Sequence, residues 1–232
     1  MLSQFRKGLL HGIPIALGYL SVSFGFGIMA VRSGLSVLSA VMISVTNLTS
    51  AGQAAGVEII AAAGTLMEMA LTQLVINIRY SLMGISLSQK LDKSFNIPHR
   101  LAVSYGITDE IFAVASAQIH PVTPAYMYGL ILIAFLGWST GTFLGAAAGE
   151  ILPEMITNAM GIVLYGMFIA IIIPPSRKQK SVLAAVVIAA AVSVLFKYVF
   201  TIVSGGFAVI ISACVAAAAA ALLFPVKEEQ EE

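Results

Sequence analysis

Long apolar segments without charged side chains alternate with short polar stretches along this chain. No Asp, Glu, Lys or Arg occurs in residues 8–31, 33–57, 111–149, 155–176, 181–196 or 198–226. A transmembrane helix needs about 20 mainly apolar residues, and segments of this kind supply such helices. They lack the alternation of apolar and polar residues that is typical of a membrane β-barrel. The pattern therefore predicts an all-α protein, a polytopic membrane helical bundle.

Nine of the 12 Lys and Arg residues fall in four clusters between these segments. The clusters are Arg6/Lys7, Lys90/Lys93/Arg100, Arg177/Lys178/Lys180 and Lys227, whereas the loops near 119–125 and 150–155 contain no Lys or Arg. Cytoplasmic loops of membrane proteins carry an excess of Lys and Arg. We therefore expect both termini to be cytoplasmic and the two loops without Lys or Arg to face outside.

Two segments do not fit a simple crossing. Three apolar segments separate Arg100 from Arg177, although both should lie on one side, so one segment should not cross fully. Segment 101–119 is short and polar near its middle, and segment 35–56 is rich in Ser, Thr, Asn, Gln and Gly. We interpret both as broken or re-entrant, as in transporters with discontinuous helices.

The remaining apolar segments supply about six full spans, which are 13–31, 57–88, 124–149, 155–173, 181–199 and 203–224. An eight-span topology, in which the two broken segments also cross, stays open. The whole chain, 1–232, is expected to form a single integral membrane domain, with residues 225–232 as a charged, solvated tail.

Composition and charge narrow the function classes. Hydrophobic residues make up 59% of the chain and charged residues 10%, with a formal net charge of +1. Soluble domains carry about 25% charged residues, and nucleic-acid binding needs a basic patch, so both classes are excluded. His11, His99 and His120 lack metal-ligand spacing, and no catalytic triad or carboxylate pair stands out. We expect neither an enzyme nor a bound metal or cofactor.

A polar run within segment 35–56 is the first candidate site. It contains Asn47, Ser50 and Gln53 together with several glycines and hydroxyl residues. Unmatched polar groups are costly in lipid, so this run must face protein or a water-filled cavity. We interpret the three named residues as substrate-binding, and the alternative is helix packing through small residues.

Glu68 is the second candidate. If 57–88 is one helix, Glu58, Thr65, Glu68, Thr72 and Arg79 fall within an arc of roughly 80°, with Glu68 midway along it. A carboxylate at the bilayer centre is costly unless it is paired, hydrated or protonated, so Glu68 is a proton-coupling candidate. The alternative is a neutral, hydrogen-bonded side chain that holds helices together.

Asn77 and Arg79 form a third candidate pair near the end of the same segment. They point about 160° apart on a helix and should serve different neighbours. The Arg79 guanidinium suits a substrate carboxylate, because a bidentate fork matches it. A structural role, with a lipid phosphate or with Asp109 or Glu110 as its partner, stays open.

The run Thr108-Asp109-Glu110 carries the most information. Two adjacent acids in an apolar segment are hard to explain by packing. Thr108 or Asp109 suits the N-cap of a helix that begins there, with its dipole directed at a site. We assign all three residues to substrate binding and the two acids also to proton coupling; a structural cap paired with Arg79 is the alternative.

Glycine recurs at every fourth residue of segment 124–149, at Gly137, Gly141, Gly145 and Gly149. This spacing places the four glycines on one helix face, where they permit close approach of a second backbone. The repeat predicts helix packing rather than chemistry.

These motifs together resemble the AzlC family, the large subunits of two-component exporters of branched-chain amino acids. The resemblance rests on Phe24-Gly25-Phe26-Gly27, Ser50-Ala-Gly52-Gln53, Asn77-Ile-Arg79, Gly106-Ile-Thr108-Asp109-Glu110 and the Trp138/Gly141/Gly145/Gly149 pattern. It implies a multi-pass protein of the bacterial inner membrane that works with a small AzlD-like membrane subunit and an amino-acid substrate. A homo-oligomer is left open.

The leading hypothesis is therefore a secondary transporter that exports branched-chain or other apolar amino acids, driven by proton exchange. No nucleotide-binding motif indicates ATP hydrolysis. Two alternatives stay open: a channel-like pathway for a small solute, and a membrane scaffold subunit that does not transport.

Overall fold

The computed structural model describes residues 2–149, 151–153, 155, 166, 168–170 and 172–225. The all-α prediction is confirmed, because the described residues form helices joined by turns and contain no strand beyond one isolated bridge between Leu91 and Val122. The chain divides into two compact units, Met1–Val57 with Ile76–Leu164, and Glu58–Val75 with Tyr165–Glu232.

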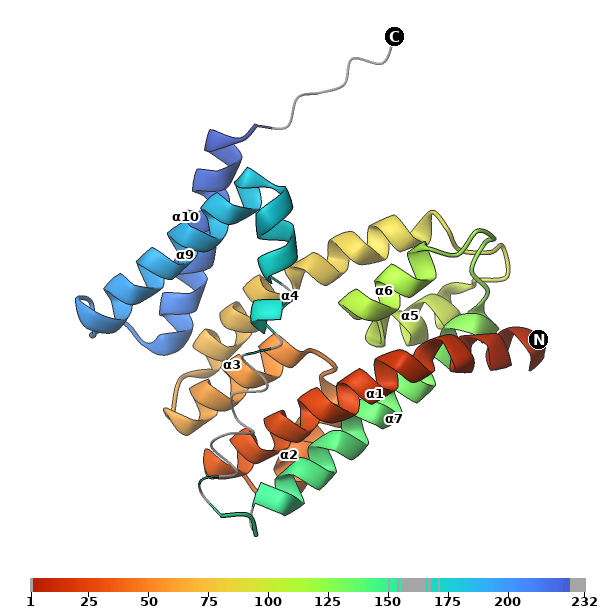
Figure 1. Cartoon of the computed structure of the whole chain (residues 1–232), viewed down its shortest axis with the longest axis horizontal. Coiled ribbons are helices and arrows are strands. Elements are labelled where there is room, and N and C mark those ends of the chain that lie inside the picture. The colour runs from red at the N-terminus through yellow and green to blue at the C-terminus, as the bar shows by residue number, and fades with distance from the viewer. Residues whose placement is uncertain are drawn as a thin grey trace. The chain divides into compact units, whose positions relative to one another are not determined.

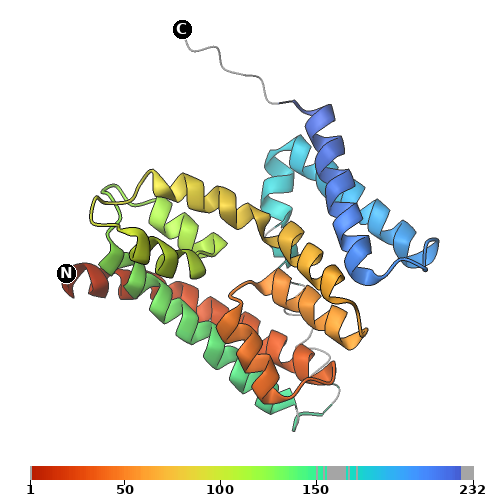
Figure 2. The same ribbon diagram turned by 180° about the vertical axis from the view of Figure 1, so that it is seen from behind.

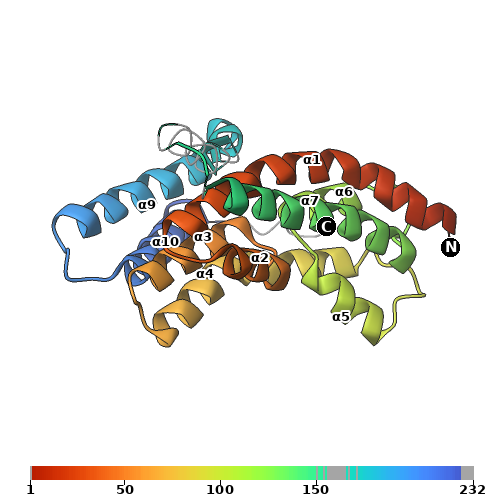
Figure 3. The same cartoon turned by 90° about the horizontal axis from the view of Figure 1, so that it is seen from below.

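Helices α1 (Leu2–Arg32) and α7 (Pro124–Gly149) form the framework of the first unit (Figure 1). They lie side by side and run in the same direction, as the view from below also shows (Figure 3). Close approaches include Phe5 with Gly129, Ala16 with Gly137, Leu20 with Gly141, Phe24 with Gly145 and Ile28 with Gly149, so all four glycines of the predicted repeat meet α1. Because glycine has no Cβ, the backbones of α1 and α7 touch along their length.

Two pairs of short helices pack beside this framework. The first pair is α2 (Val37–Thr46) and α3 (Ser50–Ala61), which are interrupted at 47–49. The second is α5 (Ile97–Tyr105) and α6 (Asp109–Ser116), which are interrupted at 106–108. Both predicted discontinuous segments are therefore broken helices, although the first extends beyond 56 and the second begins before 101.

After the second helix pair, α5 and α6, the chain returns to the end of the unit at which α5 begins. Val122 exchanges backbone hydrogen bonds of 2.9 Å with Lys90 and Asp92, so residues 92 and 122 are held together. Lys90 Nζ also donates to the Ser116 carbonyl, and Lys7 Nζ donates to Gln118 Oε1 at 3.1 Å. Helix α6 packs against α1 and α5 packs against α7. Seen from behind, both helices lie towards the end of the unit where the chain begins (Figure 2).

This closure corrects one expectation from charge. The loop near 119–125 was expected to face outside because it lacks Lys and Arg, yet it lies at the same end as two basic clusters. The parallel course of α1 and α7 requires this, since both helices begin at that end. Helices α5 and α6 therefore start and return at one end of the unit, which agrees with the prediction of a broken or re-entrant segment 101–119. The number of membrane spans stays a prediction.

The prediction of one continuous helix over 57–88 is also wrong. Helix α3 ends at Ala61, and α4 (Leu66–Ser88) begins after a turn in which Ala63 has a φ of 51°. Thr65 Oγ1 accepts a hydrogen bond of 3.1 Å from the Glu68 backbone N–H, which is the geometry of an N-cap. Glu68 therefore lies in the first turn of α4 and not midway along a long helix.

The second unit contains α9 (Lys180–Tyr198) and α10 (Gly205–Leu223), which pack against each other. Within the described residues, four helices are long and apolar enough to cross a membrane, namely α1, α7, α9 and α10. They match four predicted spans, but α1 starts at Leu2 instead of residue 13. Most of the predicted span 155–173, the acids at 150 and 154, and the tail after residue 225 lie outside the described residues.

The contact between α1 and α7 can be tested at Gly145. A Cβ at this position would overlap the backbone of Phe24, so Gly145→Leu must force the two helices apart. We expect Gly145→Leu to abolish the yield of folded, monodisperse protein in size-exclusion chromatography. Gly18→Leu is the matched control, because no atom lies within 4 Å of its added Cβ. A folded Gly145→Leu protein of normal yield would contradict the packing role.

Candidate functional site

Helices α3 and α6 begin directly after the two interruptions, and a threonine caps each of them. Thr49 Oγ1 accepts a hydrogen bond of 3.4 Å from the Gly52 N–H at the start of α3. Thr108 Oγ1 accepts one of 3.3 Å from the Ile111 N–H at the start of α6. These caps satisfy backbone donors that a helix N-terminus leaves free. Of the two caps that the sequence left open for α6, the structure selects Thr108.

The two interruptions share a short sequence pattern. Asn47-Leu48-Thr49 separates α2 from α3, and Gly106-Ile107-Thr108 separates α5 from α6. In each, the residue that ends one helix is followed by an apolar residue and then by the threonine cap. This repeat was a usable signal in the sequence, because an apolar residue and a threonine recur where each broken segment restarts.

Helix α4 connects the two interruptions. Thr49 Oγ1 donates a hydrogen bond of 2.9 Å to Asn77 Oδ1. Two residues later, Arg79 Nη1 lies 2.7 Å from Asp109 Oδ2 and 2.8 Å from Oδ1. Asn77 therefore contacts the start of α3, and Arg79 contacts the first residue of α6.

The Arg79–Asp109 ion pair is accessible. The Arg79 side chain is 40% exposed and that of Asp109 36% exposed. The guanidinium also lies over the Tyr80 ring, 4.9 Å from its centroid, and donates to the Tyr80 hydroxyl at 3.2 Å. Asp109 and Tyr80 thus hold the Arg79 guanidinium, while part of the guanidinium and part of the Asp109 carboxylate stay exposed.

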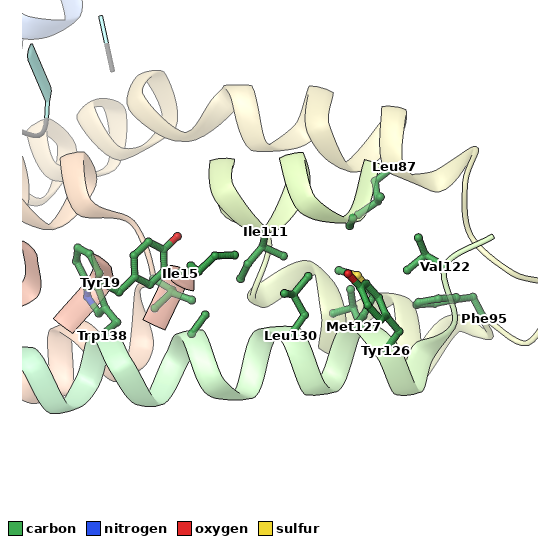
Figure 4. Close-up of a cluster of buried hydrophobic side chains, with 14 residues drawn as sticks. Ile15, Tyr19, Leu87, Phe95, Ile111, Val122, Tyr126, Met127, Leu130 and Trp138 are labelled. Carbon is green, nitrogen blue, oxygen red and sulfur yellow. The ribbon is translucent and has the colours of Figure 1, made fainter. Parts of the chain in front are cut away.

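Tyr19 of α1 holds the other acid of α6. Its hydroxyl donates to Glu110 Oε2 at 2.5 Å and lies 2.6 Å from Thr108 Oγ1. The ring of Tyr19 packs edge-on against Trp138 of α7, with centroids 5.2 Å apart (Figure 4). By the bounds of α1 and α7, both residues lie near the middle of their helices. The α6 terminus is therefore attached to the centre of the α1–α7 framework.

Trp138 extends the network to α3. Its Nε1 donates a hydrogen bond of 3.2 Å to Oε1 of Gln53, which is fully buried. Gln53 also accepts from Ser44 Oγ at 3.4 Å and donates to the Asn47 carbonyl, and Ser44 bonds Thr142 of α7 at 2.7 Å. Gln53 thus joins both sides of the first interruption to α7.

The predicted site residues divide into three groups. Thr108, Asp109, Glu110 and Arg79 come together at the start of α6, while Gln53 and Asn77 lie at the start of α3. Asn47 ends α2 and Ser50 begins α3, both half-buried. Glu68 belongs to the second compact unit.

The sequence interpretation missed the hydrogen-bonding partners of the first two groups, which are Tyr19, Ser44, Thr49, Trp138 and Thr142. Tyr19 and Trp138 lie within apolar helices, where an aromatic residue is ordinary core. Their spacing carries no signal, because the partners come from elements far apart in the chain. Within the part of the chain that the structure describes, no group of three His, Cys, Asp or Glu residues is arranged to hold a metal ion.

Glu68 caps a second helix in its own unit. Its Oε1 accepts hydrogen bonds from the Ser204 hydroxyl and from the Gly206 N–H at 2.9 Å, at the start of α10. The side chain is 4% exposed and lies close to Gly64 and Gly206, where a Cβ would approach the carboxylate. At 19 residues, α10 is about 28 Å long, so Glu68 lies at one end of this candidate span.

The cap at Glu68 can be tested by truncation. Glu68→Ala would leave the buried Gly206 N–H without its acceptor, and an unsatisfied buried donor costs about 1–3 kcal/mol. We expect a clearly lower thermal unfolding midpoint for Glu68→Ala than for Glu68→Gln, which keeps an acceptor oxygen. Glu58→Ala, which removes an exposed carboxylate, is the matched control. Equal midpoints for all three variants would rule out the cap.

Comparison with known proteins relates this geometry to a family. Residues 14–152 match the family model described as AzlC protein. The matched range contains both interruptions, α4 and the α1–α7 contact from residue 14 onward, and it ends before α9. No solved structure is significantly similar to the chain.

Three relatives illustrate the similarity. The chain is 29% identical to "Inner membrane protein YgaZ" of Escherichia coli, covering 74% of this chain and 73% of the relative. It is 31% identical to an "Uncharacterized membrane protein" of Archaeoglobus fulgidus, with 74% and 76% covered. It is 24% identical to "Branched-chain amino acid transport protein AzlC" of Bacillus subtilis, with 74% and 67% covered.

Proposed function

The chain belongs to the AzlC family, and we propose that it is a secondary transporter that exports branched-chain or other apolar amino acids across the bacterial inner membrane. The name of the Bacillus subtilis relative supports the substrate class, and that of the Escherichia coli relative supports the membrane. The four apolar helices α1, α7, α9 and α10 agree with a membrane transporter.

The Arg79–Asp109 ion pair is the observation that carries this proposal. Its two charges are those needed to bind a zwitterion, since a guanidinium pairs with a carboxylate and an aspartate with an ammonium group. Both side chains are partly exposed, and each belongs to a different element, α4 and α6. An amino acid that enters between them exchanges one internal ion pair for two equivalent ones, so its charged groups lose water at little cost.

The neighbouring groups favour an uncharged substrate side chain. Glu110 is engaged by Tyr19, and the Arg79 guanidinium is covered on one face by Tyr80. A charged substrate side chain would need a further counter-charge at this place, and leaving it unpaired is expensive away from water. Apolar amino acids need none, which supports branched-chain substrates.

Proton coupling is the finer part of the proposal, and Glu110 is our candidate carrier. Of the three acids considered, Asp109 is paired with Arg79, and Glu68 caps α10 in the other unit. Glu110 instead accepts from the hydroxyl of Tyr19, which also contacts the cap of α6. Protonation of Glu110 would weaken this hydrogen bond, because a neutral carboxyl is a poorer acceptor than a carboxylate, and would alter the start of α6, next to the substrate site.

The sidedness of the proposal follows from charge. The clusters Arg6/Lys7 and Lys90/Lys93/Arg100 lie with the loop 117–123 at one end of the first unit. By the positive-inside rule we assign this end, and with it the N-terminus, to the cytoplasm. We retain a cytoplasmic C-terminus and a small AzlD-like subunit as partner within the proposal.

The ion pair can be tested by substitution and charge reversal. Arg79→Gln and Asp109→Asn should each lower leucine counterflow in proteoliposomes by at least about tenfold, the effect of losing one charge-assisted hydrogen bond. The double variant Arg79→Asp with Asp109→Arg should recover thermal stability but not transport, since the substrate groups would meet the wrong charges. Measurements with and without the small subunit complete the comparison.

Lys93→Gln is the control for loss of a positive charge, because Lys93 is exposed in the loop between α4 and α5. Transport at the wild-type rate by both single variants would contradict the substrate site. Full transport by the charge-reversed protein would reduce the pair to a structural role. Absence of counterflow for every apolar amino acid in the wild type would refute the proposed function itself.

The role of Glu110 can be separated from substrate binding. Glu110→Gln resembles the protonated acid at all times, so it should retain exchange of leucine between equal pools. It should lose accumulation against a gradient when a pH gradient is imposed. Glu68→Gln should keep both activities. If Glu110→Gln still concentrates leucine under the pH gradient, proton coupling does not pass through this residue.

A further inference from the structure

A cavity of about 340 Å³ lies in the first unit between the C-terminal half of α4 and helix α5. Gly84 and Leu87 line it from α4, and Arg100 and Val103 from α5. It lies outside the network of hydrogen bonds around the two interruptions. Its volume falls at the lower end of the range for small-molecule sites.

The lining of this cavity suits one kind of ligand. Leu87, Phe95 and Val103 are buried and present apolar surface. Arg100 is its one charged lining residue, and within the described residues it forms no ion pair. A guanidinium without a carboxylate beside apolar walls is complementary to a small anion or zwitterion with an apolar side chain.

The position of the cavity links it to the substrate site. Ser81 of its lining follows Tyr80 directly, and Ile107 precedes the cap residue Thr108. At its other side, Leu91 belongs to the bridge with Val122, at the end that carries the basic clusters. The lining therefore reaches from the basic end of the unit to the residues beside the Arg79–Asp109 pair.

We propose that this cavity is the loading site for the amino acid on the basic, cytoplasmic end. Arg100 receives the substrate carboxylate, and the walls formed by α4 and α5 receive its apolar side chain. The amino acid then passes to Arg79 and Asp109. This inference rests on the proposed function and adds to it a binding site and a specificity-determining residue, Arg100.

Filling the cavity is the first test. No atom lies within 4 Å of a Cβ added at Gly84, so Gly84→Phe extends into the cavity without a backbone clash. We expect the KM for leucine presented at the cytoplasmic face to rise at least about tenfold, with the KM at the other face unchanged. Gly18→Phe is the matched control, since its added Cβ also meets no atom within 4 Å and Gly18 does not line the cavity.

Removing the guanidinium is the second test. Arg100→Gln should raise the same KM about 10- to 100-fold, as expected for a lost charge-assisted hydrogen bond, and Arg100→Lys should recover part of it. The effect should be equal in vesicles of neutral and of anionic lipids. A loss that depends on anionic lipid would mean that Arg100 holds a lipid phosphate, and it would overturn the proposal.

Binding can also be read without transport. Ser104 lines the cavity, and Cys214 is the one natural cysteine, so Ser104→Cys in a Cys214→Ser background gives a single thiol there. Leucine should slow its modification by a water-soluble maleimide, whereas aspartate and lysine should not. Ser86→Cys, on the same helix α4 but outside the lining, should show no leucine protection.

The outcomes separate the two proposals. Transport by the wild type without leucine protection, together with a normal KM for Gly84→Phe, would overturn the loading site and leave the proposed function intact. Leucine protection in a protein that transports no apolar amino acid would contradict the proposed function alone. If Gly84→Phe fails to fold, the protection of Ser104→Cys still decides the question.

Discussion

Each helix that stops inside this protein leaves backbone N–H and C=O groups that need partners, and this requirement organises the first unit. In a membrane such groups find no water, so protein groups must bind them. Thr49 and Thr108 cap the starts of α3 and α6, and Gln53 binds the carbonyl at the end of α2. The caps are themselves contacted by Asn77 and Tyr19, so the same bonds that satisfy the interruptions also hold α1 and α4 beside them.

The α1–α7 contact supplies the support for these bonds. Its glycines bring the two backbones together, which fixes Tyr19 against Trp138 near the middle of both helices. From there one hydrogen bond leads to Glu110 of α6 and another to Gln53 of α3. Glu110 and Gln53 are therefore positioned by this pair of helices, whereas the Arg79–Asp109 pair stays partly exposed.

The re-entrant course of α5 and α6 gives the unit its direction. Because Val122 is bonded to Lys90 and Asp92, the chain returns to the end of the unit from which α5 started, and α7 then starts beside the start of α1. A charge-based topology missed this at the loop 117–123, since a short loop without Lys or Arg carries no orienting information. The neighbouring cavity with Arg100 lies on the same side of the interruption, which gives the polar site an approach from the basic end.

The sequence by itself determined the membrane class, four of the spans and the two interruptions, because apolar length and buried polar runs are local properties. It did not reveal the turn at 62–65, since Ala61-Ala62-Ala63 favours a helix; Ala63 adopts a positive φ there while Thr65 caps α4. The partners of Glu68, Arg79 and Gln53 were likewise decided only by the tertiary structure. Each contact joins elements distant in sequence, and helical spacing reports which residues share a face but not what that face meets.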